Sequence, residues 1–257
     1  MFGFFRPKNR ERWPSLPSEL SPVYASLQAL LPRDYQLVKE LELVRPRRDL
    51  LAVTRDARRF VLSCWESPGD EQLRRHERNF EVVRRLRHPG ILPVLDSGSN
   101  EQWCWWLRPW VEGETLEVRL GRGPVELAEG RDWMRQLVEA IDSAHSLGVV
   151  HRGIRPENIW IESGRVLLAD FAVEDPFDRH RVQVGTDPFG PKVPYLAPEQ
   201  IMASANGPES DYYSLGTIAF LMFTGRFPFE GDSLMQAIIR ILQETPPRIT
   251  EIVPDLP

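Results

Sequence analysis

The segment HRGIRPENIW at residues 151–160 decides the fold of this chain, together with three short stretches that follow it. The stretch IWIESGRVLLADF at 159–171 has two strand-like halves around a Ser-Gly pair, a pattern typical of an antiparallel hairpin. YLAPEQ follows at 195–200, and DYYSLG opens an apolar helix at 211–216. No single stretch carries the interpretation, which depends on their order and spacing.

The part of the chain before this segment has the pattern of a small sheet. Strand-like stretches separated by charged or polar breaks are YQLVKELELV at 35–44, LLAVTR at 50–55, FVLSCW at 60–65, ILPVLDSG at 91–98 and QWCWWLRPWV at 102–111. Residues 70–86 carry apolar residues at helical spacing among arginines, which predicts one helix. The tryptophans of the last stretch favour a packed strand over a base-stacking surface, because basic residues are sparse around them.

The chain after residue 123 is mainly helical in pattern. Apolar residues recur at helical spacing over 133–141, in a helix that Gly148 is suited to end. A second helix, DYYSLGTIAFLMF at 211–223, is apolar almost all round, so we expect it to be buried and to end at Gly225. A third, SLMQAIIRIL at 233–242, begins with serine and glutamine in the spacing of a capping box.

Composition excludes several classes of protein. The 257 residues are 42% hydrophobic and 27% charged, which fits one large domain or two lobes, and the net charge of -5 gives no general attraction to nucleic acid. Cys64 and Cys104 lack metal-ligand spacing and suit a reducing compartment. The best apolar run, 215–223, is about half of the roughly 20 residues needed to cross a bilayer. We expect a cytoplasmic protein with no nucleic-acid partner and no membrane span.

Order and spacing together resemble the signature set of protein kinases, in which a catalytic loop, a DFG motif and an APE motif follow one another. The stretches HPGILPVLDSG, VEGETL, HSLGVVH and FTGRFPFEG make the chain most similar to bacterial Ser/Thr kinases of eukaryotic type, over residues 35–257. The resemblance implies a two-lobed α+β fold, with a small antiparallel β lobe carrying one helix and a mainly helical large lobe. It divides the chain into a proline-rich arm at 1–33, a small lobe at 34–112 and a large lobe at 113–257, truncated before the last helices of the family.

The same resemblance implies that residues for phosphoryl transfer are missing. The catalytic aspartate of the family, its general base, falls on Gly153, which has no side chain. The lysine of the third strand falls on Ser63, or on Cys64 if the strand is shifted by one residue. The glutamate that pairs with this lysine falls on Asn79. Lys39 could replace the lysine from another strand, although nothing supplies its carboxylate partner.

Part of the nucleotide site of the family is retained. Asn158 and Asp170 stand at its metal-ligand positions, Arg155 replaces a phosphate-contacting lysine, and Val111 falls in the segment that contacts the adenine. These residues could bind ATP and magnesium weakly; alternatively, Asp170 only accepts hydrogen bonds from nearby backbone or arginines. The turn between Leu41 and Leu51 reads ELVRPRRDL, without the glycine that a phosphate cradle needs, so its three arginines either attract an anion or are simply solvated.

Two large side chains fall inside the adenine pocket of the family. Arg108 takes the position behind this pocket, and Trp160 takes the position beneath the adenine. An arginine in an apolar pocket needs a partner, and Asp170 is a candidate. Our hypothesis is that Arg108 and Trp160 fill the pocket themselves. In the alternative, Arg108 extends to solvent.

Residues with structural roles in the family are better preserved. They are His151, Phe171, Val83, Asp211 and Glu199. The first three match its internal apolar spine, and His151 is therefore expected to be a packed core histidine rather than a proton-transfer group. Asp211 matches the buried aspartate that fixes the catalytic-loop backbone. Glu199 of the APE motif normally pairs with an arginine in the missing last helices.

We therefore expect a pseudokinase, a catalytically impaired kinase-like domain that acts as a scaffold or regulator by binding a protein, such as another kinase or signalling protein. The arm and the truncated large lobe are the expected contact regions. The alternative is a divergent Ser/Thr kinase or an ATP-binding sensor that keeps magnesium and ATP through Asn158 and Asp170. No firm cofactor follows from the sequence.

Overall fold

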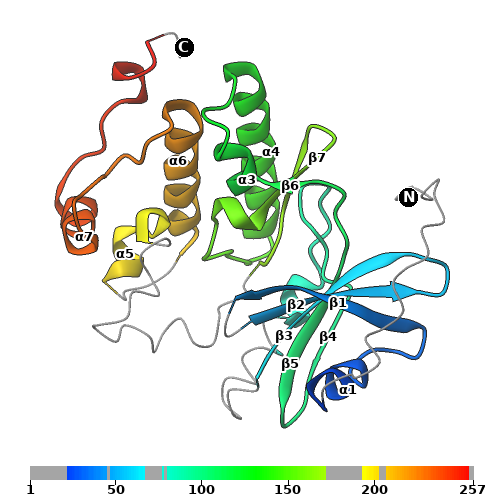
Figure 1. Ribbon diagram of the computed structural model, residues 1–257. Helices are drawn as coiled ribbons and strands as arrows, with labels where there is room; N and C mark the ends of the chain where they lie inside the picture. The colour runs from blue at the N-terminus through cyan, green and yellow to red at the C-terminus, as the bar shows by residue number, and fades with distance from the viewer. Residues whose placement is uncertain are drawn as a thin grey trace.

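The computed structural model describes residues 22–44, 47–66, 77, 80–171, 193–202 and 207–254. They form two lobes, a sheet with a short helix against it and a mainly helical lobe joined to it through the chain near residue 110 (Figure 1). The predicted two-lobed α+β fold is therefore confirmed. Asn79 and the segment 172–192 lie outside the described residues.

The small lobe is built on one antiparallel sheet with the strand order β1-β2-β3-β5-β4. Its strands are β1 (Tyr35–Val44), β2 (Arg47–Thr54), β3 (Arg59–Glu66), β4 (Asp96–Ser99) and β5 (Trp103–Pro109). Asp49 of β2 and Trp106 of β5 both lie opposite Ser63 of β3. Because side chains alternate between the two faces of a strand, this register puts these three residues on one face of the sheet.

The opposite face of the sheet is covered by α1 (Pro22–Gln28). Leu27 and Leu31 pack there against Leu62 of β3, and all three are almost inaccessible to solvent. Gln28 ties the helix to β1, since its Nε2 donates to the carbonyl of Tyr35 (2.9 Å) and its Oε1 accepts from the amide of Leu37 (2.8 Å). Residues 22–28 therefore belong with the small lobe, and the arm expected up to residue 33 includes part of the core.

The tryptophan-rich strand is packed, as predicted. Trp103 and Trp105 face the α1 side and Trp106 faces the other, and each is at most 8% exposed. Gly98 of β4 lies directly against Trp105, because a Cβ at this position would stand 2.8 Å from the indole. The expected strand at 91–98 is mostly wrong, since β4 begins only at Asp96 and Ile91 forms a single bridge to Leu168.

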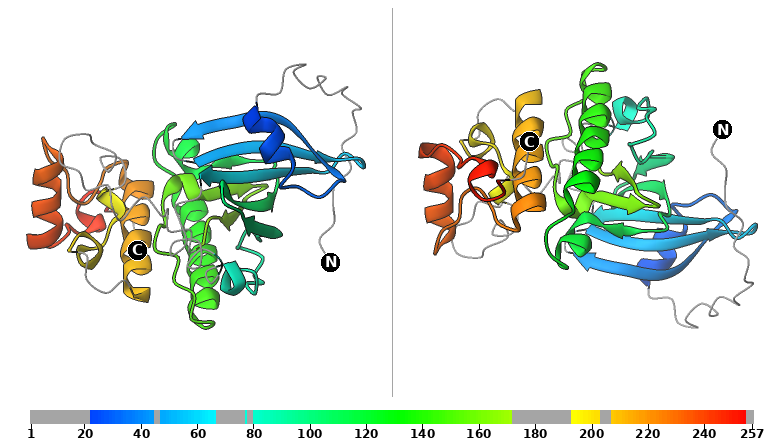
Figure 2. Two further views of the ribbon diagram at one scale, coloured as in Figure 1. Left: turned by 90° about the horizontal axis from the view of Figure 1, so that it is seen from below. Right: turned by 90° about the horizontal axis from the view of Figure 1, so that it is seen from above.

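The large lobe is centred on two helices, α4 (Leu127–His145) and α6 (Pro208–Thr224), which lie side by side (Figures 1 and 2). Trp133 and Leu137 of α4 share a core with Ile218 and Met222 of α6. Gly225 ends α6 in the left-handed region (φ +70°), as predicted, and its amide donates to the carbonyl of Leu221. Tyr212 is exposed, so α6 is buried on part of its surface only.

Shorter elements complete the large lobe around this pair. They are β6 (Glu114–Thr115), α3 (Leu116–Leu120), η1 (Pro156–Asn158), β7 (Ile159–Glu162), β8 (Arg165–Leu168), η2 (Val193–Tyr195), α5 (Pro198–Ile201), α7 (Leu234–Gln243) and η3 (Ile249–Glu251). The predicted hairpin is β7 and β8, which pair antiparallel next to β6. Ser233 caps α7, accepting a hydrogen bond from the amide of Gln236. Within the described ranges, no helix is long and apolar enough to span a membrane.

Candidate functional site

The catalytic-loop segment between α4 and β7 is held in place by Asp211 of α6. The two carboxylate oxygens of Asp211 accept hydrogen bonds from the backbone amides of His151 and Arg152, each at 2.8 Å. His145 at the end of α4 places its Nε2 2.8 Å from the same carboxylate. Asp211 is 1% exposed, so these hydrogen bonds satisfy a buried charge. They also fix the loop on which the site is built.

His151 is a core residue whose two ring nitrogens are both used. Its Nε2 donates to the carbonyl of Ala169 (2.9 Å), and its Nδ1 accepts from the amide of Gly153 (3.2 Å). Burial lowers the pKa of His151, which agrees with a neutral ring in this tautomer. The ring lies 4.6 Å from that of Phe171, centroid to centroid, and Phe171 packs in the same core as Val83. These are the contacts expected of a packed spine.

Gly153, at the expected position of the general base, lies in a loop that is held by a hydrogen bond from Asn158. The side-chain amide of Asn158 donates to the carbonyl of Gly153 (2.8 Å), and the carbonyl of Asn158 accepts from the amide of Ala169. A Cβ built on Gly153 would meet only the ring of His151, at 4.0 Å, which is ordinary van der Waals contact. The loop therefore has room for a side chain at this position and carries none.

Asp170 follows β8 and is bound by an arginine from the small lobe. Its carboxylate accepts a hydrogen bond from Nη1 of Arg47 at 2.6 Å. Asp170 has a positive φ of 62°, in the left-handed region that aspartate tolerates better than most residues. Burial alone would raise the pKa of Asp170, but the positive charges of Arg47 and Arg108 outweigh it and lower the pKa. Asp170 is therefore an ion-paired carboxylate.

Arg47, the first residue of β2, is the centre of this arrangement. Its Nε and Nη2 donate to the two carboxylate oxygens of Asp49 (2.8 and 3.0 Å), and Nη2 also donates to Oγ of Ser63 (3.1 Å). Its guanidinium carbon lies 5.5 Å from the centroid of the Trp106 ring. Burial alone would lower the pKa of Arg47, but Asp170 and Asp49 raise it above its ordinary value. Arg47 is thus permanently charged.

Sequence reasoning missed Arg47 and Asp49, which were grouped with a solvated or anion-attracting turn. The signal that could have found them is the alternation in RRDLLAVT, which puts residues 47, 49 and 51 on one face of β2. The structure also separates the two candidates for the lysine position. Ser63 faces Arg47, whereas Cys64 packs in the core beneath α1. Lys39 is exposed.

Arg108 of β5 and Trp160 of β7 meet between the two lobes, in the region that we call the cleft. The guanidinium carbon of Arg108 lies 5.4 Å from the centroid of the Trp160 ring, and Arg108 is 6% exposed. It does not extend to solvent. Its Nη2 is 3.9 Å from Asp49, and among the described residues its Nε and Nη1 have no hydrogen-bond partner. The expected partner, Asp170, is hydrogen-bonded to Arg47 instead, because Arg47 reaches it from the end of β2.

The residues of the cleft do not fit a magnesium-bound nucleotide in this arrangement. Trp160 packs with Val111 in one apolar cluster, where the family resemblance places the adenine. Asp170 already has a cationic partner, and burial lowers the pKa of Arg108, as expected for a guanidinium buried with too few partners. Throughout the described ranges, no group of three or more His, Cys, Asp or Glu residues could hold a metal ion.

The remaining expected site residues lie close to the loop. Arg155, expected to contact a phosphate, forms an ion pair with Glu157 at 3.2 Å. Glu199 at the start of α5 accepts a hydrogen bond from Oγ of Ser210 (2.7 Å), which ties α5 to α6. The roles expected of these two residues stay predictions.

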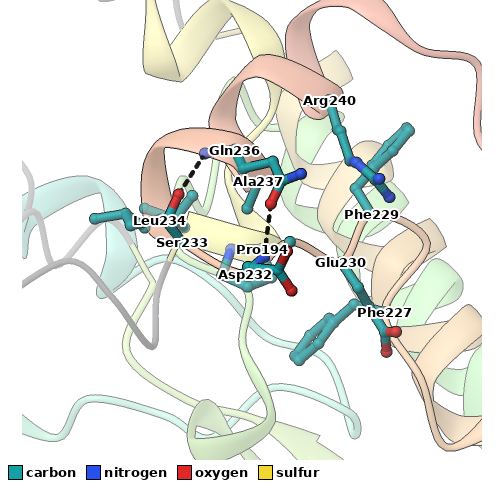
Figure 3. Close-up of a pocket in the computed structure, with 12 residues that line it drawn as sticks. Pro194, Phe227, Phe229, Glu230, Asp232, Ser233, Leu234, Gln236, Ala237 and Arg240 are labelled. Atoms are coloured by element: carbon teal, nitrogen blue, oxygen red, sulfur yellow. Dashed lines mark hydrogen bonds between the residues drawn. The ribbon is translucent and has the colours of Figure 1, made fainter.

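A separate cavity of about 830 Å³ lies in the large lobe, between η2 and the N-terminal end of α7 (Figure 3). Phe227, Phe229 and Pro194 contribute its apolar lining, and Glu230 and Asp232 add acidic groups. Figure 3 shows the capping contacts of Ser233 and Gln236 at its edge. None of its lining residues belongs to the catalytic loop or to the sheet of the small lobe.

We expect an Arg108→Leu variant to be about as stable as the unmodified chain, within about 1 kcal/mol, because losing the long ion pair with Asp49 offsets the gain from removing a poorly hydrogen-bonded guanidinium. Leucine keeps the contact with Trp160 and removes a buried guanidinium whose hydrogen bonds are incomplete. Urea unfolding followed by tryptophan fluorescence measures the difference. Arg47→Leu is the matched control, and it should be destabilising because Asp49 and Asp170 both lose their partner. A loss above about 2 kcal/mol for Arg108→Leu would contradict this expectation.

Comparison with known proteins agrees with this geometry. Residues 59–254 match the family described as "Protein kinase domain". The chain is 31% identical over 190 residues to the probable serine/threonine-protein kinase PknB of Lactococcus lactis, covering 73% of this chain and 30% of the relative. It is 33% identical over 190 residues to the serine/threonine-protein kinase PrkC of Bacillus subtilis, covering 73% of this chain and 29% of the relative. The chain thus spans less than a third of the length of these two relatives.

Among solved structures, the chain resembles a variant of the kinase domain of Mycobacterium tuberculosis PknI. The TM-score is 0.66 and the identity 26%, over 87% of this chain and 83% of that one. The similarity covers both lobes.

Proposed function

Because the chain belongs to the protein kinase domain family, we propose that it is a pseudokinase, which keeps the kinase scaffold and acts by binding a protein. The observation that carries the proposal is Gly153. The loop around it is anchored by Asp211 and Asn158 as a catalytic loop requires, yet position 153 offers no group that could accept a proton from a substrate hydroxyl. Loss of a general base typically lowers a rate by about 10²–10⁴.

The contacts of the residues at the family's lysine and metal-ligand positions support the same proposal. Ser63, at the position of the family's lysine, is a neutral hydroxyl that accepts a hydrogen bond from Arg47. Asp170, at the position of a metal ligand, is paired with the same arginine. Kinase catalysis depends on positioned metal ions and a lysine that together neutralise the phosphates. In this cleft the positive charges come from the guanidinium groups of Arg47 and Arg108. Arg47 is already ion-paired with Asp49 and Asp170.

One observation favours the second candidate function, a divergent Ser/Thr kinase or ATP-binding sensor. Arg47 stands beside Ser63 and is held by Asp49, so β2 supplies both a cation and a carboxylate partner from an unexpected place. If Arg47 turned away from Asp170, this pair could face a phosphate while Asn158 and Asp170 took a magnesium ion. The names of the relatives, which are serine/threonine-protein kinases, are consistent with this alternative.

A phosphotransfer assay with radiolabelled ATP and magnesium tests the proposal. We expect no label in the chain or in a generic protein substrate above that of a heat-denatured sample. The control is an Asp170→Asn variant, which should be indistinguishable from the unmodified chain. Labelling by the unmodified chain that Asp170→Asn abolishes would establish the divergent kinase and end the pseudokinase proposal.

A thermal-shift titration with ATP tests whether the chain is an ATP-binding sensor. A ligand at about 100 times its dissociation constant stabilises a protein by about 2.7 kcal/mol, so even weak binding raises the melting temperature measurably. We expect no shift with ATP and magnesium. A dose-dependent shift without phosphotransfer would favour the sensor.

The partner of the proposed pseudokinase would be a protein, such as another kinase or signalling protein. Support comes from α7, which presents Met235, Ile239 and Leu242 to solvent. Apolar residues spaced in this way along one helix form a typical contact surface. The net charge of -5 gives no support to a nucleic-acid partner.

A further inference from the structure

Arg47 lies between two carboxylates that come from different lobes. Its Nε and Nη2 bind Asp49 on β2, and its Nη1 binds Asp170 after β8, with all three distances between 2.6 and 3.0 Å. The side chains of Asp49 and Asp170 are 18% and 11% exposed. One guanidinium therefore bridges two largely buried carboxylates, which would repel each other without a cation between them.

The charges of the cleft balance without any added ion. Asp49 and Asp170 supply two negative charges, and Arg47 and Arg108 supply two positive charges. Carboxylate oxygens are the ligands that magnesium and manganese prefer, and here Arg47 is hydrogen-bonded to both carboxylates and competes with a metal ion for them. Arg108 adds a buried positive charge with two unpartnered nitrogens, which repels a cation further.

We propose that Arg47 is a built-in counter-cation that takes the place of a divalent metal ion between Asp49 and Asp170 and so excludes the metal from the cleft. The inference rests on the proposed function, because it explains how a kinase scaffold is stabilised without the magnesium that accompanies ATP. Exclusion of the metal then follows from the sequence of β2, which places Arg47 beside both carboxylates. Removing the guanidinium leaves two largely buried carboxylates without their shared cation, so we expect a divalent ion to bind in its place.

The test measures the binding of Mn²⁺ in the absence of nucleotide. Electron paramagnetic resonance reports the concentration of free Mn²⁺. We expect no binding to the unmodified chain at millimolar Mn²⁺. We expect an Arg47→Ala variant to bind Mn²⁺ at least about tenfold more tightly than the limit set by the unmodified chain, since one positive charge fewer faces the ion and a tenfold change is about 1.4 kcal/mol. Adding Asp170→Asn to Arg47→Ala should abolish the gain.

Arg48→Ala is the matched control. Arg48 is the neighbouring residue of β2, pairs with Glu40 at 3.1 Å and is 27% exposed, compared with 28% for Arg47. Arg48→Ala removes the same charge from the opposite face of β2 and should bind no manganese. If Arg47→Ala proves unfolded by circular dichroism, Arg47→Gln keeps most of the side-chain volume and removes the charge.

Three results would overturn the inference. They are manganese binding to the unmodified chain, no gain in a folded Arg47→Ala or Arg47→Gln variant, and a gain that survives Asp170→Asn. Each of these results is distinguishable from failure of the proposed function, because the pseudokinase proposal is tested by the phosphotransfer assay and not by manganese binding. A chain that transfers phosphate but binds no free manganese would refute the pseudokinase and leave the counter-cation in place.

Discussion

An Asp211→Ala variant should lose about 3–5 kcal/mol of unfolding free energy, the largest loss that we expect from one substitution in the large lobe. The change leaves the backbone amides of His151 and Arg152 without their acceptor, and His145 loses a contact as well. Water cannot easily replace the carboxylate, because Asp211 is 1% exposed. Urea unfolding followed by circular dichroism measures the loss.

Tyr212→Phe is the control for this substitution. It removes a hydrogen bond from the neighbouring residue of α6, where the hydroxyl of Tyr212 donates to Asp142 at the surface. Substitutions of exposed groups change the unfolding free energy little, so we expect a change within about 0.5 kcal/mol. If Asp211→Ala cost less than about 1 kcal/mol, the catalytic-loop segment would not depend on α6 for its position.

A Leu27→Ala variant should lose about 2–5 kcal/mol of unfolding free energy. Leu27 is 1% exposed and packs with Leu62 and Leu107 of the sheet, so the shortened side chain leaves a cavity beneath α1. Tryptophan fluorescence during urea unfolding is a suitable measurement, because Trp103 and Trp105 belong to the same cluster.

Ala25→Ser is the control in the same helix, since Ala25 is exposed and the change should stay within about 0.5 kcal/mol. Equal, small effects of Leu27→Ala and Ala25→Ser would mean that α1 is a dispensable arm. That outcome would support the boundary at residue 33 that the sequence suggested.

Much of the fold could be predicted from the sequence, because its signals are local. The alternation in FVLSCW and the turn residues around Gly164 mark strands, and Gly225 marks the end of a helix. The attachment of α1 could not be predicted in this way. Proline-rich composition suggested a linker, and only the sheet shows that Leu27 and Leu31 have an apolar face to cover.

The candidate site was predictable where it depends on the position of a residue in a motif, and not where it depends on the direction of a long side chain. The contacts of Asp211 and His151 follow from the order of the motifs. The partner of Asp170 does not, because Arg47 lies 123 positions earlier in the chain and was taken for part of a solvated turn. Contacts between strand ends of different lobes leave no periodic signal in the sequence.

The contact between Arg47 and Asp170 has a consequence for motion, because it joins β2 of the small lobe to the residues that follow β8 of the large lobe. Rotation of one lobe away from the other would pull apart two charged groups that are 2.6 Å apart. The contact therefore opposes separation of the lobes on this side by a modest amount, about 1 kcal/mol or less for a partly exposed pair. We expect the Arg47→Ala variant to open more readily than the unmodified chain, which small-angle scattering would show as a larger radius of gyration.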